Sequence, residues 1–487
     1  MGSSILGIAS QAIAAQQLAM QVTGNNMANA TTPGYHVESV NITENAPAPD
    51  STMPSTLIGN GVTVTAVTRA TNAFLSSSVR NQTSAVGYYT SLTQGVGQAQ
   101  SIFQEPQQGG LAEMMNQFNQ SWLALSQSPT SLTARQGVLQ AGHTLASTLN
   151  NMAGTLSTIE NGVNNNITTN VQQINQLSQQ IAQINNQIAT VSTSGQQPND
   201  LIDQRGQLLN QLTQLTNVSY ATGPANSLDV YIGSHPLVTG EQTYQINVNQ
   251  VPVPNSSGVS TFTANQPVWA DNGAPVQVQS GSLAGNMALV YSQTVSGSTG
   301  GAVTPGYLTG YGQSLDQLAQ TLATTVNTAQ AAGYNLSGTQ SVDAKGNPIP
   351  FFNGTTAGTI MVNPGLAANQ LGAASAANSP GDGTNAQSLY NALSNSSLTI
   401  GAANTTLSGY YQSLVGQVGL DGQNGNNQLT DGQSALTSLN NALQSATGVD
   451  LNQQSVQMIQ EQQSYEAAAK LVAAQQSIIQ SLLSAVG

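Results

Sequence analysis

The sequence predicts a mainly α-helical protein with a smaller β domain. Near both chain ends, apolar residues recur at alternating intervals of three and four, which is the pattern of a coiled-coil seam. A strict heptad repeat over 167–191 predicts a long helix, and its return segment, 201–215, completes an antiparallel helical hairpin. Segment 218–285 instead alternates apolar and polar residues. The expected architecture is a pair of terminal helices, a long antiparallel helical rod and an inserted β domain.

Composition restricts the possible functions. The 487 residues include 6 Lys and Arg against 19 Asp and Glu, a formal net charge of −13. These few, scattered cations argue against binding to nucleic acid or to an acidic membrane surface. The chain has no Cys and no apolar run long enough to span a bilayer. Its first 20 residues lack the basic region of a secretory signal, which leaves open a cytoplasmic protein and one exported without a cleaved signal.

Both chain ends carry a seam that we interpret as an assembly surface. Ala-rich seams bury little area, so we expect residues 1–60 and 450–487 to be mobile in the monomer and to fold together on assembly. The alternative is an ordinary core helix at each end. The N-terminal seam comprises Ile5, Ile8, Ala12, Ala15, Ala19 and Val22, and the C-terminal seam comprises Met458, Tyr465, Ala469, Val472, Ile479, Leu483 and Val486.

The segments between the seams follow in order. Residues 56–67 predict a β-hairpin that turns at Gly59-Asn60-Gly61. Helices are expected over 73–149, with breaks at Pro106 and Gly109-Gly110, and again over 315–332 and 385–446. We therefore divide the chain into a terminal assembly domain (1–66 with 447–487), a rod-like helical domain (67–217 with 286–446) and a small β domain (218–285).

No pattern of catalytic, cofactor-binding or metal-ligating residues emerges, so an enzyme is not expected. The three histidines lack clustered carboxylates, and phosphate-loop, GxGxxG and GxSxG patterns are absent. One charged cluster stands out, formed by Asp200, Asp203 and Arg205. We interpret Asp200 as a helix N-cap. Because residues two apart on a helix do not face each other, Arg205 is expected to bond to another segment rather than to Asp203.

Three stretches resemble one family. The run Asn25-Asn26-Met27-Ala28-Asn29-Ala30-Thr31-Thr32-Pro33-Gly34-Tyr35 is similar to the motif that closes the first helix in bacterial flagellar rod, hook and hook-associated proteins. The run from Asn199 to Arg205, and the C-terminal stretch from Gly448 to Lys470, are similar to the hook-associated proteins of the hook–filament junction, the FlgK family. The chain departs from the family at Asn452, Gln453 and Gln454, where acidic residues are usual, and it lacks much of the outer-domain sequence of long members.

The resemblance implies a self-assembling structural component of the bacterial flagellum. Such proteins leave the cell through the flagellar type III export pathway, without a cleaved signal peptide, and are located extracellularly. They form a ring or tube of identical subunits between the hook protein and a second junction protein or the flagellin filament, and filament assembly requires them. An export chaperone is a further implied partner, whereas no cofactor, nucleic acid or membrane insertion is implied.

Three alternatives remain at this point. A flagellar rod or hook protein would share the Asn-Asn and Gly-Tyr motif, but it is expected to be β-rich where this chain has a helical hairpin. An enzyme attached to the axial structure would need a catalytic site within 218–285, which holds only Asp229, Glu241 and Asp271 as carboxylates. A surface adhesin would use the β domain as its binding face.

The low charge also suggests that the protein works in an acidic medium. Carboxylates in ion pairs lose their stabilising effect as they are protonated, whereas amides keep their hydrogen bonds at low pH. Asn452, Gln453 and Gln454 stand where relatives are acidic. The alternatives are compositional drift or a neutral surface suited to close packing.

Overall fold

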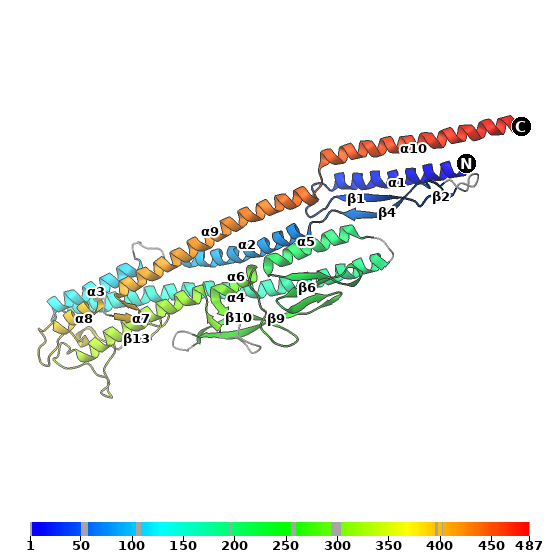
Figure 1. Ribbon diagram of the computed structural model, residues 1–487. Helices are drawn as coiled ribbons and strands as arrows, with labels where there is room; N and C mark the ends of the chain where they lie inside the picture. Colours follow the sequence, from blue (N-terminus) through cyan, green and yellow to red (C-terminus); the bar gives the residue numbers. More distant parts are fainter. Residues whose placement is uncertain are drawn as a thin grey trace. The chain divides into compact units, whose positions relative to one another are not determined.

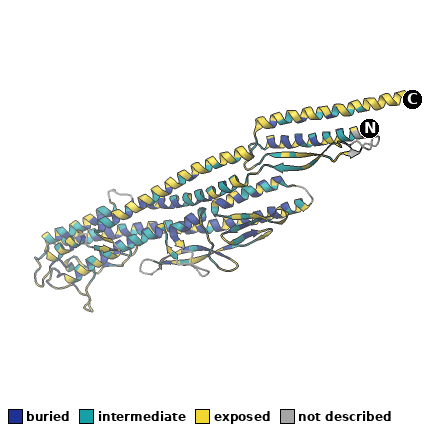
Figure 2. Ribbon diagram, viewed as in Figure 1, coloured by how far each residue is buried: buried dark blue, intermediate teal, exposed yellow. Residues whose placement is uncertain are grey.

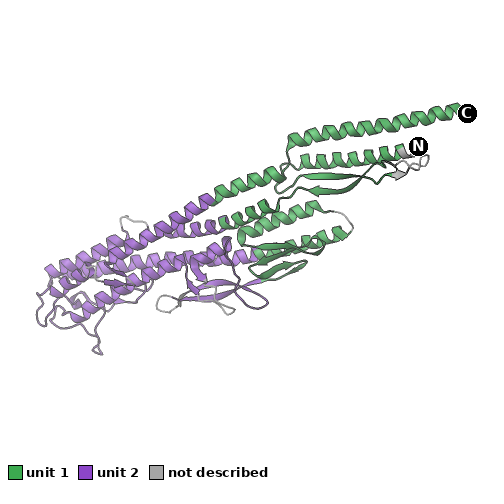
Figure 3. Cartoon of the chain, in the orientation of Figure 1, with its two compact units in different colours: residues 1–85, 174–245, 432–487 green, residues 86–173, 246–431 purple. Residues whose placement is uncertain are grey.

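The computed structural model describes residues 2–49, 57–103, 109–193, 197–254, 260–293, 303–394, 398–401 and 403–486. Helices dominate, as predicted, and the strands form small antiparallel sheets. The chain divides into two compact units, one of residues 1–85, 174–245 and 432–487, the other of 86–173 and 246–431 (Figure 3). Three of the boundaries between the units fall within helices, because α2 (Ala73–Gln100), α4 (Leu132–Thr193) and α9 (Leu407–Thr447) each contribute to both units.

The first unit contains the two terminal helices, α1 (Gly2–Ala28) and α10 (Leu451–Val486), which lie side by side (Figure 1). The seam patterns therefore correctly predict a helix at each end and their packing against each other. On its other side α1 contacts β1 (Glu38–Glu44) and β4 (Val62–Arg69). We call α1 and α10 the terminal pair.

The strands beside the terminal pair are connected differently from the prediction. Strand β4 pairs antiparallel with β1, from Glu38 opposite Arg69 to Glu44 opposite Val62. Strand β3 (Leu57–Ile58) pairs with β2 (Ala48–Pro49). The predicted hairpin over 56–67 is therefore wrong, although Thr56 itself lies outside the described residues. Gly59-Asn60-Gly61 joins two strands that belong to different two-stranded sheets.

The same unit holds the end of the helical hairpin. Helix α4 and helix α5 (Asn199–Leu215) confirm the two predicted segments, and Ile181 and Ile188 of the heptad repeat are fully buried. A four-stranded sheet follows, in the order β5-β6-β7-β8. Its strands are β5 (Ser219–Thr222), β6 (Leu228–Ile232), β7 (His235–Thr239) and β8 (Gln242–Thr243), with the short 3-10 helix η1 (Pro224–Asn226) between the first two.

The second unit is built around helices α3 (Leu111–Gln127), α7 (Tyr307–Ala332) and α8 (Thr384–Ser394) with the adjoining parts of α2, α4 and α9. Its core contains four aromatic rings in mutual contact: Phe118, Trp122, Phe351 and Phe352. The remaining elements are β9 (Ile246–Pro254), β10 (Ser260–Trp269), α6 (Ser282–Val290), β11 (Tyr291–Gln293), β12 (Val303–Pro305), β13 (Phe352–Asn353), β14 (Met361–Val362), η2 (Ala368–Gln370), β15 (Leu398–Ile400) and β16 (Ala403–Thr405). The strands pair as the hairpins β9-β10, β11-β12, β13-β14 and β15-β16.

Candidate functional site

The motif at the end of the first helix folds around one side chain, Asn26. Helix α1 ends at Ala28, and Gly34 adopts a positive φ of 76°, a conformation that favours glycine. Asn26 is 1% exposed. Its amide nitrogen donates to the Glu38 carbonyl (2.8 Å) and to Gln454 Oε1 (3.0 Å). Its carbonyl oxygen accepts from the Glu38 amide (2.9 Å) and the Tyr35 hydroxyl (2.8 Å).

These four bonds use the full donor and acceptor capacity of an amide side chain. They bring together the end of α1, the loop, β1 and α10. Asn25, Asn29 and Thr32 add bonds within the loop. The motif residues that the sequence singles out therefore fix how the chain leaves the first helix.

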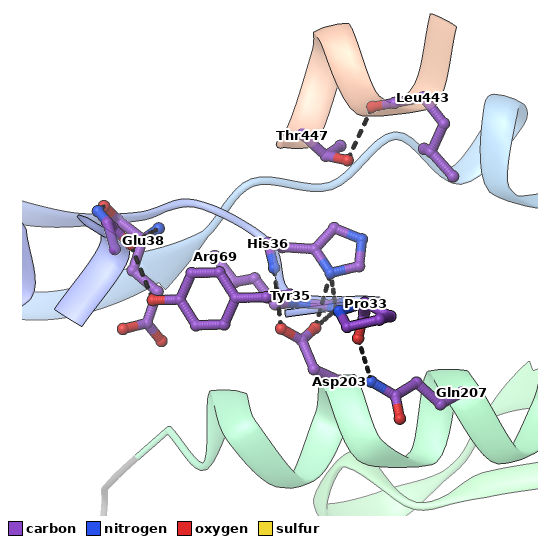
Figure 4. Close-up of polar contacts among 10 residues, drawn as sticks. Pro33, Tyr35, His36, Glu38, Arg69, Asp203, Gln207, Leu443 and Thr447 are labelled. Carbon is purple, nitrogen blue, oxygen red and sulfur yellow. Dashed lines mark hydrogen bonds and ion pairs between the residues drawn. The ribbon is translucent and has the colours of Figure 1, made fainter. Parts of the chain in front are cut away.

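A face of helix α5 receives this loop. Asn199, Asp203 and Gln207 are four residues apart, so they lie along one side of the helix. Asn199 Nδ2 donates to the Val67 carbonyl (3.2 Å) at the end of β4, and Gln207 Nε2 donates to the Pro33 carbonyl. Asp203, at the centre, points towards His36 and Arg69 (Figure 4). We call these seven residues the joint.

Asp203 is the electrostatic centre of the joint. It is 7% exposed, and its Oδ2 accepts from the His36 backbone amide at 3.0 Å. Its Oδ1 lies 2.8 Å from His36 Nδ1 and also accepts from Arg69 Nη1. Asp203 thus forms an ion pair with Arg69 and a close polar contact with the His36 ring. In a chain with only 6 Lys and Arg, one of them is thus used where the first 69 residues meet helix α5.

Burial raises the pKa of two acidic groups near the joint, Glu38 and Tyr35. Burial is the main reason why the pKa of Glu38 is raised, and the negative charges of Asp200 and Asp203 raise it further. A hydrogen bond from Asn199 acts in the opposite direction and lowers this pKa. Burial is also the main reason why the pKa of the Tyr35 hydroxyl is raised, with Glu38 next. The tyrosine therefore stays a hydrogen-bond donor to Asn26 at any physiological pH.

Arg205 projects away from Asp203, as its spacing predicts. It donates to Asn185 Oδ1 (2.8 Å) on α4 and to the Asn226 carbonyl (2.6 Å). Asn185 in turn bonds to Leu228 and Gly240 in the four-stranded sheet. Burial, with a smaller contribution from Arg69, lowers the pKa of Arg205 to about 10. The expected bond from Arg205 to another segment is confirmed.

The N-cap prediction for Asp200 is wrong. Helix α5 begins at Asn199, which places Pro198 at the N-cap and Asp200 in the first turn, where it is exposed. A carboxylate in the first turn still interacts favourably with the helix dipole.

Two further arginines are also held by neutral groups. Arg80, on α2, bonds to Asn210 Oδ1 (3.0 Å) and to the Tyr220 hydroxyl, with its guanidinium 4.8 Å from the centre of the Tyr220 ring. Arg135, in the second unit, is fully buried and donates to the carbonyls of Pro129 (2.8 Å) and Leu371 (2.6 Å).

The structure places the predicted seam residues unevenly. On α1, Ala15, Ala19 and Val22 are buried, Ile8 and Ala12 are half-buried, and Ile5 is exposed. On α10, Met458, Tyr465, Ala469 and Val472 are half-buried, whereas Ile479 and Leu483 are 40% and 69% exposed. Nothing is described for the side chain of Val486. The exposed C-terminal part of α10 is visible in Figure 2.

The line on α10 that is buried consists of Gln454, Glu461 and Ala468, seven residues apart. Sequence reasoning missed it because two of the three side chains are polar. The available signal was the heptad spacing itself, combined with the near absence of charge around Glu461. Gln454 and Glu461 bond to Asn26 and Thr23 of α1.

Comparison with known proteins identifies the family. A model of the flagellar hook-associated protein FlgK helical domain matches residues 96–344, just over half of the chain. The chain belongs to the FlgK family of flagellar hook-associated proteins. Residues 6–36 match a model of flagella basal body rod proteins, and 441–485 match the C-terminal model of the flagellar basal body rod FlgEFG proteins. The two terminal helices therefore carry the part common to rod and hook proteins, and the helical part distinguishes FlgK.

Several relatives are named flagellar hook-associated protein 1. The one from Bacillus subtilis is 29% identical over all of this chain and 99% of its own length. The one from Escherichia coli is 26% identical over 74% of this chain and 63% of its own length. The match thus spans less than two thirds of the Escherichia coli protein, in line with the missing outer-domain sequence.

A solved structure agrees with this fold. The flagellar hook junction protein FlgK from Burkholderia pseudomallei matches 76% of this chain and 99% of that one, with a TM-score of 0.61 and 17% identity. FlgK proteins are structural components of the extracellular flagellum rather than enzymes. No helix in the described part of the chain is long and apolar enough to cross a membrane. Within those same ranges, no group of three or more His, Asp or Glu could hold a metal ion.

Proposed function

We propose that this chain forms a ring or tube of identical subunits at the junction between the flagellar hook and the filament. The hook protein is the neighbour on one side, and a second junction protein or flagellin is the neighbour on the other. Similarity to the flagellar hook-associated protein 1 of Bacillus subtilis, and a fold shared with the hook junction protein of Burkholderia pseudomallei, support this placement. An export chaperone that holds the terminal segments before secretion completes the set of proposed partners.

The observation that carries the proposal is the surface of α10. Along its length this helix exposes several large apolar side chains to about half or more of their area. Exposed apolar side chains on this scale are typical of a surface that a partner covers. A second copy of the chain offers the same helix and is the natural occupant in a symmetric assembly. The residues are Leu451, Val456, Ile459, Leu471, Ile478 and Leu482.

The joint supports a mechanical role within that assembly. It ties the loop after α1 and the end of β4 to α5 through Asp203, and Asn26 ties the same loop to α10. Subunit contacts made by the terminal pair are thereby connected to the helical hairpin. We retain the division into a terminal assembly domain (1–66 with 447–487), a helical domain (67–217 with 286–446) and a β domain (218–285) as part of this proposal.

Deletion of the gene tests the proposed function directly. Electron microscopy of the deletion strain should show hooks without filaments, and flagellin should accumulate in the medium because it is exported but not retained. Expression of the intact chain should restore filaments. Normal filaments on the deletion strain would contradict the proposal.

Ile479→Asp and Leu483→Asp should each abolish filament formation when expressed in the deletion strain. Both residues are exposed in the single chain, so the new carboxylate costs little until a neighbouring subunit buries it without a partner. The melting temperature of the purified variants should therefore match that of the unmodified chain. The measurement is filament counting beside thermal melting.

Gln480→Asp is the matched control, because it adds the same charge to an exposed position in the same turn. It should permit filaments. If it blocks assembly equally, added charge rather than the seam explains the result. Normal filaments with either seam variant would remove Ile479 and Leu483 from the interface.

A further inference from the structure

A carboxyl group lies at the centre of the contact between the two terminal helices. Glu461 is 8% exposed and belongs to the buried line of α10 that faces α1. Its Oε1 accepts a hydrogen bond from the Thr23 hydroxyl of α1 at 3.1 Å. Its Oε2 is buried and has no hydrogen-bond partner in the structure. One half of this carboxyl group is therefore removed from water without compensation.

No cation faces Glu461. Helix α1 has no charged side chain along its whole length. On α10 the other charged residues are Glu466 and Lys470, both exposed. On the strands that cover the far side of α1, the charged residues are Glu38, Glu44 and Arg69, and Arg69 is bound to Asp203. Asp450, just before α10, bonds to the backbone amides of Asn452 and Gln453.

A buried carboxylate without a cation is costly, whereas a neutral carboxylic acid is tolerated. Burial raises the pKa of Glu461, and the nearby polar side chains of Thr23 and Gln457 oppose the shift without cancelling it. The helices therefore pack best when Glu461 carries a proton. When α10 separates from α1, the group returns to water and titrates with its ordinary pKa.

We propose that Glu461 is a proton-dependent latch that closes the terminal pair in acid and loosens it towards neutral pH. The direction follows from linkage, because the paired state binds the proton more tightly than the separated state. Pairing is strongest below the ordinary pKa of a glutamic acid and weakens as pH rises through the higher value of the paired state. This inference rests on the proposed function in one respect: pairing of α1 with α10 is taken to form the surface that neighbouring subunits bind.

The latch would couple assembly to the environment of the subunit. Inside a neutral cell the terminal helices would favour separation, the state suited to export. In an acidic medium they would favour the pair that presents the exposed apolar side chains of α10. The position of Glu461 thus gives the acid-medium hypothesis a specific site of action.

Spin labels test the latch on the isolated full chain. The chain has no Cys, so Gln21→Cys on α1 and Gln463→Cys on α10 introduce the only two labelling sites, both exposed. Pulsed electron spin resonance then gives the ratio of a narrow, paired distance population to a broad, separated one between pH 4 and pH 8. The paired fraction should fall as pH rises.

Glu461→Gln should remove this dependence and raise the ratio of paired to separated chains roughly tenfold at pH 8, as expected when an unsatisfied buried charge is removed. Glu461→Met, which fills a similar volume without a titrating group, should also be independent of pH. Glu466→Gln is the matched control on the same helix and should behave like the parent.

Several results would overturn the latch. These are an unchanged pH dependence in both Glu461 variants, loss of that dependence in Glu466→Gln, or the absence of a narrow population at every pH. None of these measurements involves filaments. If the pH dependence fails but the Ile479 and Leu483 variants still block filaments, the latch is refuted and the proposed function stands. If the pH dependence is found but filaments form without this chain, only the proposed function is refuted.

Discussion

Replacing Asp203 by Ala should lower the free energy of unfolding of the first unit by about 3 kcal/mol, the cost of breaking a buried ion pair by removing one partner. The substitution leaves the Arg69 guanidinium without its carboxylate and the His36 amide without its acceptor. Amide hydrogen exchange measured by mass spectrometry should show faster exchange in 33–44 and 199–207, since local opening exposes these backbone amides. Asp203→Asn, which retains one acceptor oxygen, should lower the free energy of unfolding by a smaller amount.

Asp200→Ala is the control for the joint. Asp200 lies one turn earlier on α5 and is exposed, so its removal should change exchange in these segments only slightly. Equal effects of the Asp200 and Asp203 substitutions would mean that the helix dipole, rather than the contacts of the joint, accounts for the loss. Similar exchange in the parent and in Asp203→Ala would show that the joint contributes no stability.

Glu160→Gln should raise the free energy of unfolding of the second unit by about 3 kcal/mol near neutral pH. This is the free energy that corresponds to a rise of the Glu160 pKa from 4.5 to about 7 on folding. Glu160 on α4 is 8% exposed and lines a cavity of about 180 Å³ together with Asp316 of α7. Burial raises the pKa of Glu160 to about 7, and the charge of Asp316 adds to the effect. Asp316 itself has a raised pKa because of burial.

The pH dependence follows from the direction of this shift. The folded state holds the Glu160 proton up to about pH 7, whereas the unfolded chain releases it near 4.5. The unit should therefore be more stable at pH 4.5 than at pH 7, and the difference should disappear in Glu160→Gln. Urea unfolding monitored by the buried Trp122 and Trp269 reports on this unit. Asp431→Asn, at an exposed position in the same unit, should keep the slope of the parent.

The result bears on the acid-medium hypothesis. Buried carboxyl groups that prefer the neutral form, such as Glu160 and Glu461, make acid favourable to folding instead of harmful. A profile that falls steeply below pH 4 would count against adaptation to acid. A slope of the opposite sign between pH 4.5 and pH 7 would contradict the burial of Glu160.

The helices were predictable because their apolar faces repeat over many turns. The heptad repeat ending at Val191 and the return segment to Leu215 located the C-terminal end of α4 and both ends of α5 to within two residues, but they did not show that α4 begins as early as Leu132. Strand pairing was less accessible. Strand β4 has a clear alternation of apolar and polar residues. Its partner β1 has the sequence Glu-Ser-Val-Asn-Ile-Thr-Glu, which contains only two apolar residues, so the pattern favoured pairing of β4 with the residues just before it.

The candidate site was recognised only as separate pieces. The motif around Asn26 and the run around Asp203 stood out individually, but a sequence separation of 167 between His36 and Asp203 hides their contact from any local pattern. The regular spacing of Asn199, Asp203 and Gln207 was the one signal that a single face of α5 binds something. The buried line of Gln454, Glu461 and Ala468 escaped detection because hydrophobic periodicity follows apolar residues, and here a polar line occupies the contact.

The arginines held by neutral groups have a consequence for life in salty water. Arg80, Arg135 and Arg205 bond to carbonyl, amide and hydroxyl oxygens at short range, inside the protein. Dissolved ions weaken attractions between exposed charges over distances near a Debye length, about 8 Å at physiological ionic strength, but they do not enter such contacts. Brine and fresh water should therefore be nearly equivalent for these three arginine contacts, and even the pair of Asp203 with Arg69 is largely buried.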